Sequence, residues 1–173
     1  NYTSARIKTQ GLKSFQYGRV DVRAKLPKGK GIWPALWMLG DNISSASWPN
    51  CGEIDIMEMI GGGVSNEKTI YGTLHWDDNG SHASYGGNNS LNSGIFADEF
   101  HVFSIIWNSS SIEFLRDDIQ YHIADITPTQ LSEFHQNFFL IFNVAVGGNW
   151  PGNPDGTTDF PQSMYVDYIR VFQ

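Results

Sequence analysis

The sequence predicts an all-β protein, a sandwich of two antiparallel sheets. Short runs of alternating or continuously apolar residues recur along the 173 residues, and segments rich in Gly, Asn, Ser and Pro separate them. No long stretch shows a convincing helical repeat of apolar positions. Because we find neither an internal repeat nor a linker, we expect residues 1–173 to form a single domain.

The first clear strand covers Tyr17–Leu26. Its residues alternate, with Val20, Val22, Ala24 and Leu26 on one face and Arg19, Asp21, Arg23 and Lys25 on the other. This pattern predicts one buried face and one polar face. The turn cluster Pro27–Gly31 follows, and the apolar run Ile32–Leu39 after it ends at Gly40.

Six further strands are predicted along the rest of the chain. They cover Glu53–Ile60, Thr69–Trp76, Phe100–Asn108, Ile112–Arg116, Phe138–Val146 and Tyr165–Phe172. Asn1–Ile7 also reads as the inside of a strand, with no turn before it. We expect Asp41–Asn50 and Asp77–Gly94 to be long polar loops and Thr127–His135 to be a short helix.

Composition excludes several classes of protein. The formal net charge is −7, from 11 Lys and Arg against 18 Asp and Glu, without a basic run, so no nucleic-acid partner is expected. Cys51 is the only cysteine, which excludes a disulfide framework. No apolar run approaches the roughly 20 residues of a bilayer span, so no membrane partner is expected. The six Trp favour stacking on sugar rings, although a large aromatic core explains them equally well.

Three acidic residues, Glu53, Asp55 and Glu58, lie within the apolar segment Cys51–Ile60. Burial of unpaired carboxylates costs several kcal/mol each, so three of them need a reason. An exposed edge strand would place all three on one face, but Glu58 lies at odd spacing from the other two. A β-bulge at Ile56–Met57 would turn Glu58 to the same face, and bulges are frequent beside active sites.

Two glutamates on either side of a glycosidic bond are the minimum equipment for its hydrolysis. Carboxyl groups roughly 5 Å apart allow a covalent glycosyl-enzyme and retention of configuration, whereas roughly 6.5–9.5 Å leaves space for an attacking water and gives inversion. Two acids on one bulged strand favour the shorter separation, so we expect retention. Asp55, which lies between them, fits an auxiliary acid that keeps one glutamate ionised and the other protonated.

The motif from Glu53 to Glu58, EIDIME, resembles that of glycoside hydrolase family 16. The similarity runs from about Thr3 to Gln173 and includes the blocks Tyr17–Pro27, Gly31–Gly40, Trp48–Gly52, Phe142–Gly152 and Tyr165–Gln173. The resemblance implies a jelly-roll sandwich with a concave substrate cleft. It also implies endo-acting, retaining hydrolysis of β-glucans or galactans, with no cofactor required for the chemistry. By position, Glu53 corresponds to the nucleophile, Asp55 to the auxiliary acid and Glu58 to the general acid/base.

The extra Met57 within the motif resembles the laminarinase branch of this family. That branch cleaves β-1,3-glucosidic bonds in laminarin-type β-glucan by double displacement. Three alternatives stay open: a hydrolase of mixed-linkage glucan or of a galactan, a transglycosylase, and a non-catalytic glucan-binding module. The resemblance also implies a secreted, extracellular protein.

The resemblance covers a shortened domain. Roughly the first quarter of a usual family domain is absent, so we expect residues 1–173 to be a single catalytic domain truncated at its N-terminal side. The missing segment was lost or travels as a separate chain, and strands without their usual neighbours would have unpaired edges. The family often binds a structural Ca²⁺, and Asp167 matches the usual side-chain ligand, with its partner ligands in the missing region.

Residues around the motif are candidates for substrate binding. They are Arg23, Trp33, Trp37, Trp48, His75, Asn143 and Trp150. Core packing is the alternative for the tryptophans, a structural histidine for His75, and an exposed salt-bridge face for Arg23. Trp107 shares a face with apolar neighbours and is expected in the core, whereas Trp76 stays undecided. The five histidines show no spacing typical of metal ligands.

Overall fold

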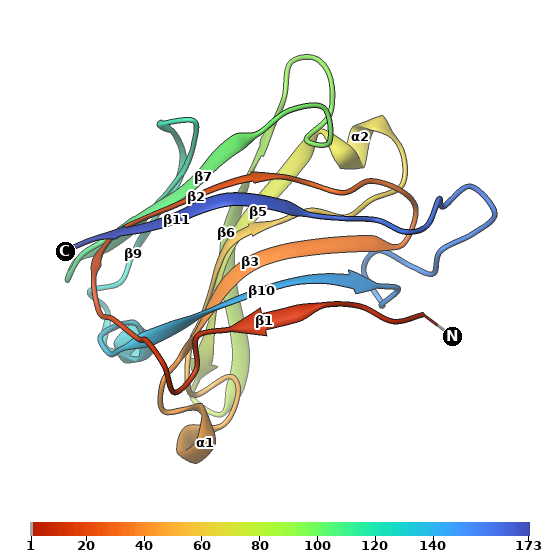
Figure 1. The fold of residues 1–173 in the computed structure, drawn as a ribbon. Coiled ribbons are helices and arrows are strands. Elements are labelled where there is room, and N and C mark those ends of the chain that lie inside the picture. The colour runs from red at the N-terminus through yellow and green to blue at the C-terminus, as the bar shows by residue number, and fades with distance from the viewer. Residues whose placement is uncertain (1) are drawn as a thin grey trace.

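The computed structural model describes residues 2–173, which form two antiparallel sheets packed face to face (Figure 1). The six-stranded sheet has the order β1 (Arg6–Lys8), β10 (Phe138–Val146), β3 (Ile32–Gly40), β4 (Glu53–Glu58), β5 (Thr69–Asp78), β6 (Ser81–Ser90). The five-stranded sheet has the order β11 (Tyr165–Phe172), β2 (Gly18–Lys25), β7 (His101–Trp107), β8 (Ser111–Arg116), β9 (Ile119–Asp125). The predicted all-β sandwich is confirmed.

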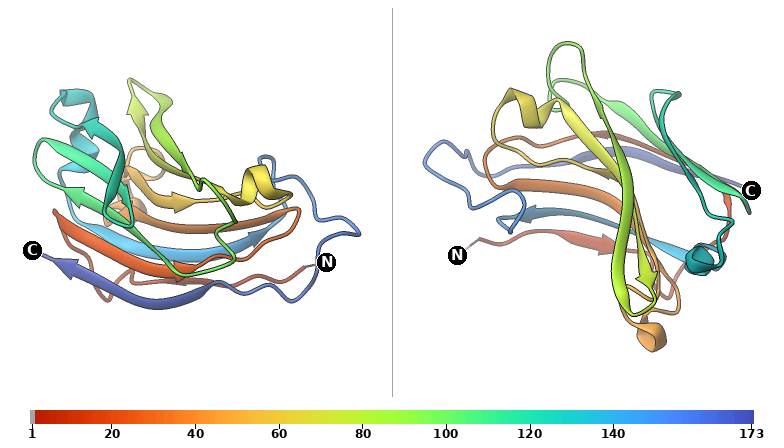
Figure 2. Two further views of the ribbon diagram at one scale, coloured as in Figure 1. Left: turned by 90° about the horizontal axis from the view of Figure 1, so that it is seen from above. Right: turned by 180° about the vertical axis from the view of Figure 1, so that it is seen from behind.

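The core lies between the two curved sheets (Figure 2). Val20, Val22 and Ala24 of β2 are fully buried there, against Leu36 and Met38 of β3 in the facing sheet. Trp107 is also in the core, as predicted; its side chain is 1% exposed, and its indole Nε1 donates a hydrogen bond to the carbonyl of Phe134 at 3.1 Å. The polar faces of the strands therefore point outward, away from the opposite sheet.

Two strands were missed in the sequence. β6 lies within the predicted loop Asp77–Gly94, and β9 follows β8 directly. The segment SHASYGGNNS of β6 has almost no apolar alternation, yet it pairs with β5 over ten residues, from Thr69↔Ser90 to Asp78↔Ser81. The available signal was the turn: Asn79 and Gly80 both have positive φ, and Asn-Gly is the strongest short hairpin signal.

Helical structure is sparse among the described residues. The predicted short helix at Thr127–His135 is a 3₁₀ helix, η1 (Thr129–Phe134). Two four-residue helices, α1 (Ile43–Ala46) and α2 (Val64–Glu67), were not predicted. No helix in the described part of the chain is long and apolar enough to cross a membrane. The first strand is shorter than the predicted Asn1–Ile7, and β1 begins only at Arg6. Asn1 lies outside the described residues.

The predicted bulge in β4 is confirmed. Trp37 of β3 pairs with Asp55 and Leu36 pairs with Met57, so Ile56 is the extra residue in the ladder. On the other side, Asp55 pairs with Thr73 and Glu58 with Tyr71. Ile56 and Met57 both point into the core, with 1% and 0% exposure. Glu58 consequently shares the outer face of the sheet with Glu53 and Asp55.

This register predicts opposite outcomes for two single-residue deletions in β4. Deletion of Met57 removes the bulge and leaves Glu58 opposite Ala35 and Tyr71, so the protein should still fold, with a loss of about 1.5–3 kcal/mol from the burial of one Met. Deletion of Ile54 turns Glu53 into the core and should prevent folding. Urea unfolding followed by circular dichroism measures both; equal behaviour of the two variants would contradict the register.

Candidate active site

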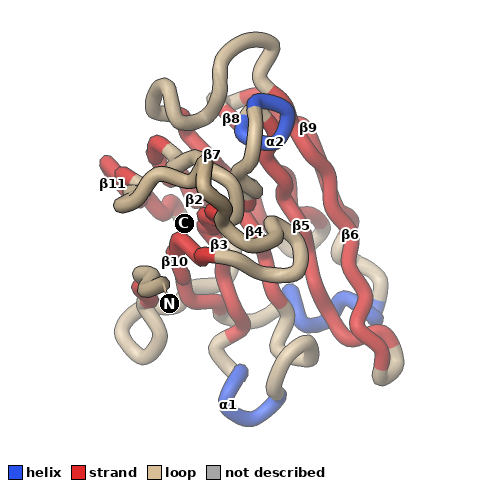
Figure 3. Tube along the Cα trace, turned by 90° about the vertical axis from the view of Figure 1, so that its right-hand side faces the viewer, coloured by secondary structure: helices blue, strands red, loops and turns tan. Residues whose placement is uncertain are grey.

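An open cleft of about 390 Å³ lies on the outer face of the six-stranded sheet. The strands of both sheets are drawn in red in Figure 3. Four strands and the segment before β1 line the cleft with Ser4, Arg6, Trp33, Ala35, Trp37, Glu53, Asp55, Glu58, Asn143 and Ala145. The three acids of the motif therefore share one cleft. Ala35 and Ala145 contribute only small side chains to the lining, whereas Trp33 and Trp37 contribute indole rings.

Each glutamate is held by a tryptophan. The indole Nε1 of Trp33 donates a hydrogen bond to Oε1 of Glu58 at 2.9 Å. The indole Nε1 of Trp48 donates to Oε2 of Glu53 at 3.1 Å. These rings thus orient the two carboxyl groups from opposite ends of the motif, in addition to any contact with a ligand.

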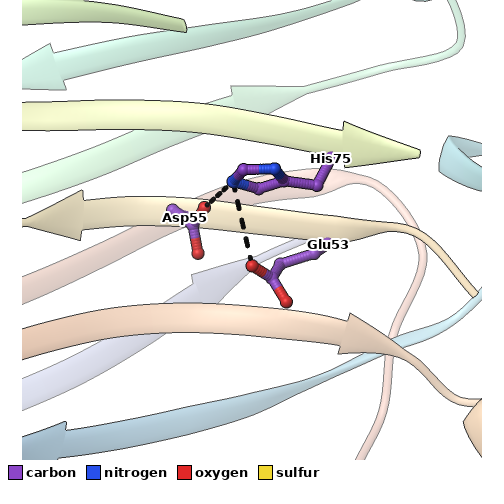
Figure 4. A group of neighbouring side chains, drawn as sticks. All are labelled: Glu53, Asp55 and His75. Atoms are coloured by element: carbon purple, nitrogen blue, oxygen red, sulfur yellow. Dashed lines mark ion pairs between the residues drawn. The ribbon is translucent and has the colours of Figure 1, made fainter. Parts of the chain in front are cut away.

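Asp55 is the most deeply buried of the three acids, at 3% exposure. Its Oδ2 lies 3.1 Å from Nε2 of His75, and the same nitrogen lies 3.9 Å from Oε1 of Glu53 (Figure 4). His75 belongs to β5, opposite Glu53 in the ladder. One imidazole therefore faces both carboxyl groups.

Burial dominates the electrostatics of these acids. It raises the pKa of Glu53 to about 8, and the neighbouring charge of Asp55 adds to the rise. Burial likewise raises the pKa of Asp55, with a contribution from the charge of Glu58. Burial also raises the pKa of Glu58, although the hydrogen bond from Trp33 opposes this. Burial therefore favours the protonated form of all three carboxyl groups.

The other predicted aromatic residues take different positions. Trp150 and Trp48 are 42% and 46% exposed and lie at the two ends of the acid row. Trp150 packs edge-on against Trp33, with ring centroids 5.6 Å apart. Trp37 is half-buried, and its Nε1 donates to Oδ1 of Asn143 at 2.7 Å, which places the predicted amide at the cleft.

Three residues at the cleft were missed in the sequence. The guanidinium of Arg6 lies over the ring of Trp37, 4.8 Å from its centroid. Tyr71 packs against Trp150 at 5.0 Å, and His82 against Trp48 at 4.7 Å. Tyr71 could have been found, because it shares a face of β5 with Thr73 and His75. Arg6 and His82 carried no such signal, because their strands lack a readable alternation.

The prediction that Arg23 binds substrate is wrong. Arg23 lies on the outer face of the five-stranded sheet, since its neighbours Val22 and Ala24 point into the core. The cleft is on the opposite side of the sandwich. The guanidinium Nη1 of Arg23 forms an ion pair with Oδ2 of Asp167 at 2.6 Å, so the alternative of a salt-bridge face holds.

The ion pair with Arg23 involves Asp167, the expected calcium ligand. Asp167 is half-exposed, and its carboxylate already has a cationic partner in Arg23. In the described part of the chain, Asp167 belongs to no group of three converging His, Cys, Asp or Glu side chains. Ca²⁺ takes six to eight oxygen ligands, so calcium at Asp167 needs further oxygen ligands from outside these side chains.

An aromatic cleft with converging carboxyl groups on a two-sheet jelly-roll sandwich defines a carbohydrate-active protein of the glycoside hydrolase class. The family model described as "Glycosyl hydrolases family 16" matches residues 1–170, and the chain belongs to this family.

The chain is similar to longer proteins. It is 40% identical over 175 residues to the clotting factor G alpha subunit of Tachypleus tridentatus, covering 99% of this chain and 25% of that protein. It is 38% identical over 182 residues to a beta-glucanase of Rhodothermus marinus, covering 99% and 63%. Among solved structures, the catalytic domain of an endo-1,3-beta-glucanase (laminarinase) from Thermotoga petrophila RKU-1 matches with a TM-score of 0.86 and 48% identity, covering 97% of this chain and 68% of that one. The chain thus spans less than two thirds of these two curated relatives.

The raised pKa of Glu53 predicts a pH-dependent stability. Between pH 4.5 and about 8 the folded protein keeps a proton on Glu53 that the unfolded chain releases, so the free energy of unfolding falls as the pH rises through this window. Glu53→Gln removes this dependence and keeps an oxygen to accept from Trp48. We expect the variant to be about 2–4 kcal/mol more stable relative to wild type at pH 8 than at pH 5.

Urea unfolding at the two pH values measures this difference. Asp167→Asn, in a residue far from the cleft, serves as the control and should not change the slope of stability against pH in the same direction. An unchanged difference between wild type and Glu53→Gln at pH 5 and pH 8 would contradict the raised pKa.

Proposed function

We propose that this domain is an endo-acting, retaining glycoside hydrolase that cleaves β-1,3-glucosidic bonds in laminarin-type β-glucan. The observation that carries the proposal is the pair Glu53 and Glu58, each held by an indole N–H, in one open cleft between exposed aromatic rings. The similarity to the laminarinase of Thermotoga petrophila RKU-1, at 48% identity, supports this choice of substrate.

The chemistry assigned to the two glutamates follows double displacement. Glu53, ionised, attacks the anomeric carbon, while Glu58 donates a proton to the leaving glycosidic oxygen. Because Trp33 donates to Oε1 of Glu58, the transferable proton resides on Oε2. A water then breaks the glycosyl-enzyme bond, and Glu58 takes up the proton of that water.

Asp55 controls which acid ionises first. It is buried more deeply than Glu53, and we assign to Asp55 the proton that the row retains when Glu53 ionises. This leaves Glu53 as the carboxylate facing the sugar. We therefore assign Asp55 the auxiliary role and His75 the role of positioning Asp55 and Glu53 through its Nε2.

Trp48 and Trp150 are proposed as the stacking platforms on either side of the bond to be cleaved. Trp48 lies beside Glu53 and Trp150 beside Trp33 and Glu58, and each exposes over two fifths of its surface. Aromatic faces stack on the C–H faces of sugar rings. An open cleft with platforms at both ends suits cleavage within a polymer.

Glu53→Ser should abolish turnover of laminarin and leave oligosaccharide binding intact, because the loss removes the nucleophile but not the platforms. We expect kcat to fall by at least about 10³-fold, in line with the loss of covalent catalysis. A reducing-sugar assay on laminarin, lichenan and agarose measures turnover, and titration calorimetry with a β-1,3-oligosaccharide measures binding.

Proton NMR of the first product decides the stereochemistry; release of the β-anomer supports retention, and the α-anomer would contradict it. Greater activity on lichenan or agarose would favour the mixed-linkage or galactan alternative. Product chains longer than the substrate would favour a transglycosylase. Equal activity of wild type and Glu53→Ser would refute the catalytic assignment.

We also propose that residues 1–173 are part of a longer, extracellular catalytic domain, completed by a polypeptide segment outside them. Among the described residues, β1 and β11 are edge strands, one in each sheet (Figure 1). Both contribute residues to a groove of about 900 Å³. Apolar side chains exposed along these edges include Ile7 at 66%, Ile169 at 42% and Phe172 at 51%. Exposed apolar edges of this kind are usually covered.

Extending the native chain upstream of residue 1 should protect these edges. We expect slower amide hydrogen exchange in β1 and β11 of the extended protein, with no change in the central strand β7 as the internal control. Exchange at the two edges that is identical in both forms would contradict the proposal. Fractionation of the source cells and medium tests the extracellular location.

A further inference from the structure

Three potential ligand atoms converge at the centre of the cleft. Oε1 of Glu53, Oδ2 of Asp55 and Nε2 of His75 all lie within 4.8 Å of one another (Figure 4). The nitrogen is 3.1 Å from the Asp55 oxygen and 3.9 Å from the Glu53 oxygen. The residues come from two adjacent strands, β4 and β5, so the backbone ladder holds them in place.

Asp55 points an unsatisfied atom into this group. Its side chain is 96% buried, and Oδ2 has no hydrogen-bond partner among the described residues. The contact with His75 is close but lacks the geometry of a hydrogen bond. Buried polar atoms are nearly always satisfied, so an unpaired carboxylate oxygen facing an imidazole nitrogen indicates room for a ligand that bonds to both.

We propose that Glu53, Asp55 and His75 bind one Zn²⁺ ion. One imidazole nitrogen and two carboxylate oxygens, with a fourth position open to the cleft, are ligand atoms that zinc accepts. Ligand atoms about 2.0–2.1 Å from a tetrahedral zinc are about 3.4 Å apart. The three atoms therefore need to move by about 1 Å or less, which side-chain rotation provides.

His82 orients the imidazole. Its Nε2 lies 2.8 Å from Nδ1 of His75, and the two rings stack with centroids 5.1 Å apart. When Nδ1–H of His75 donates to Nε2 of His82, the lone pair of His75 Nε2 faces the two carboxylates. Such a partner on the second ring nitrogen is a regular feature of metal-bound histidines.

The bound ion would act as an inhibitor, an inference that rests on the proposed function. Zinc on Glu53 occupies the electron pair that attacks the sugar and fills the space in front of it. Laminarin and zinc then compete for the cleft. Removal of the ion by a chelator restores the free carboxylate, so inhibition is reversible.

Titration calorimetry of the tag-free 173-residue chain with ZnCl₂ tests the site directly, with MgCl₂ as the comparison ion. We expect one zinc per chain and no Mg²⁺ binding, because Mg²⁺ prefers an octahedral all-oxygen shell. His75→Gln should weaken zinc binding at least tenfold, and His82→Phe about 10–100-fold, since the ring remains but the acceptor is lost. His122→Gln, which alters a histidine of β9 outside the group, should bind as wild type does.

Circular dichroism confirms that each variant is folded, and laminarin assays with zinc, then with EDTA, measure inhibition. Zinc binding that is lost in His75→Gln but retained in His122→Gln supports the site, even if the chain proves inactive on laminarin. Equal zinc binding by wild type and His75→Gln, or no binding by wild type, would overturn it, whatever the activity. An active wild type whose zinc binding leaves laminarin hydrolysis unchanged would overturn the competition.

Discussion

The bulge in β4 is the constraint on which the cleft depends. A strand of EIDIME without it would send Glu58 into the core, where an unpaired carboxylate costs several kcal/mol. With Ile56 as the extra residue, two successive apolar side chains enter the core and all three acids face the cleft. The packing of Ile56 and Met57 between the sheets is thus what holds Glu58 beside Glu53.

The same arrangement creates an electrostatic cost. The charges of Asp55 and Glu58 raise the pKa of Glu53, and the charge of Glu58 raises the pKa of Asp55, in addition to the effect of burial. Two indole donors and one imidazole offset part of this cost by facing the acids. Such a site is less stable than an apolar sheet face would be, and it gains carboxyl groups whose pKa is raised above the usual range, as is common at functional sites.

The free edges of the sandwich have a different origin. β1 and β11 end their sheets within the described residues, and apolar side chains line the groove between them. The strand that carries the three acids, β4, lies inside the six-stranded sheet, between β3 and β5. The geometry of the acid row is therefore supported locally, while the edge of the sandwich depends on whatever covers it.

Much of this architecture was readable from local pattern. Alternation along Tyr17–Leu26 predicted β2 and its buried face, and the odd spacing of Glu58 predicted the bulge, because side-chain direction in a strand follows from parity alone. The motif and its neighbouring blocks identified the family. β6 was missed because its small polar residues form a strand only through pairing with β5, and its turn residues were the sole local signal.

In the strands that were predicted, the alternation of side chains specified which residues are buried and which are polar. The side of the sandwich on which each polar face lies depends on the tertiary structure, since alternation separates the two faces of a strand but does not say which sheet the strand joins. Arg23 therefore lies behind the cleft, paired with Asp167. For the same reason His75, which contacts His82 of the neighbouring strand, meets Asp55 and Glu53 of β4 only once the sheet has formed.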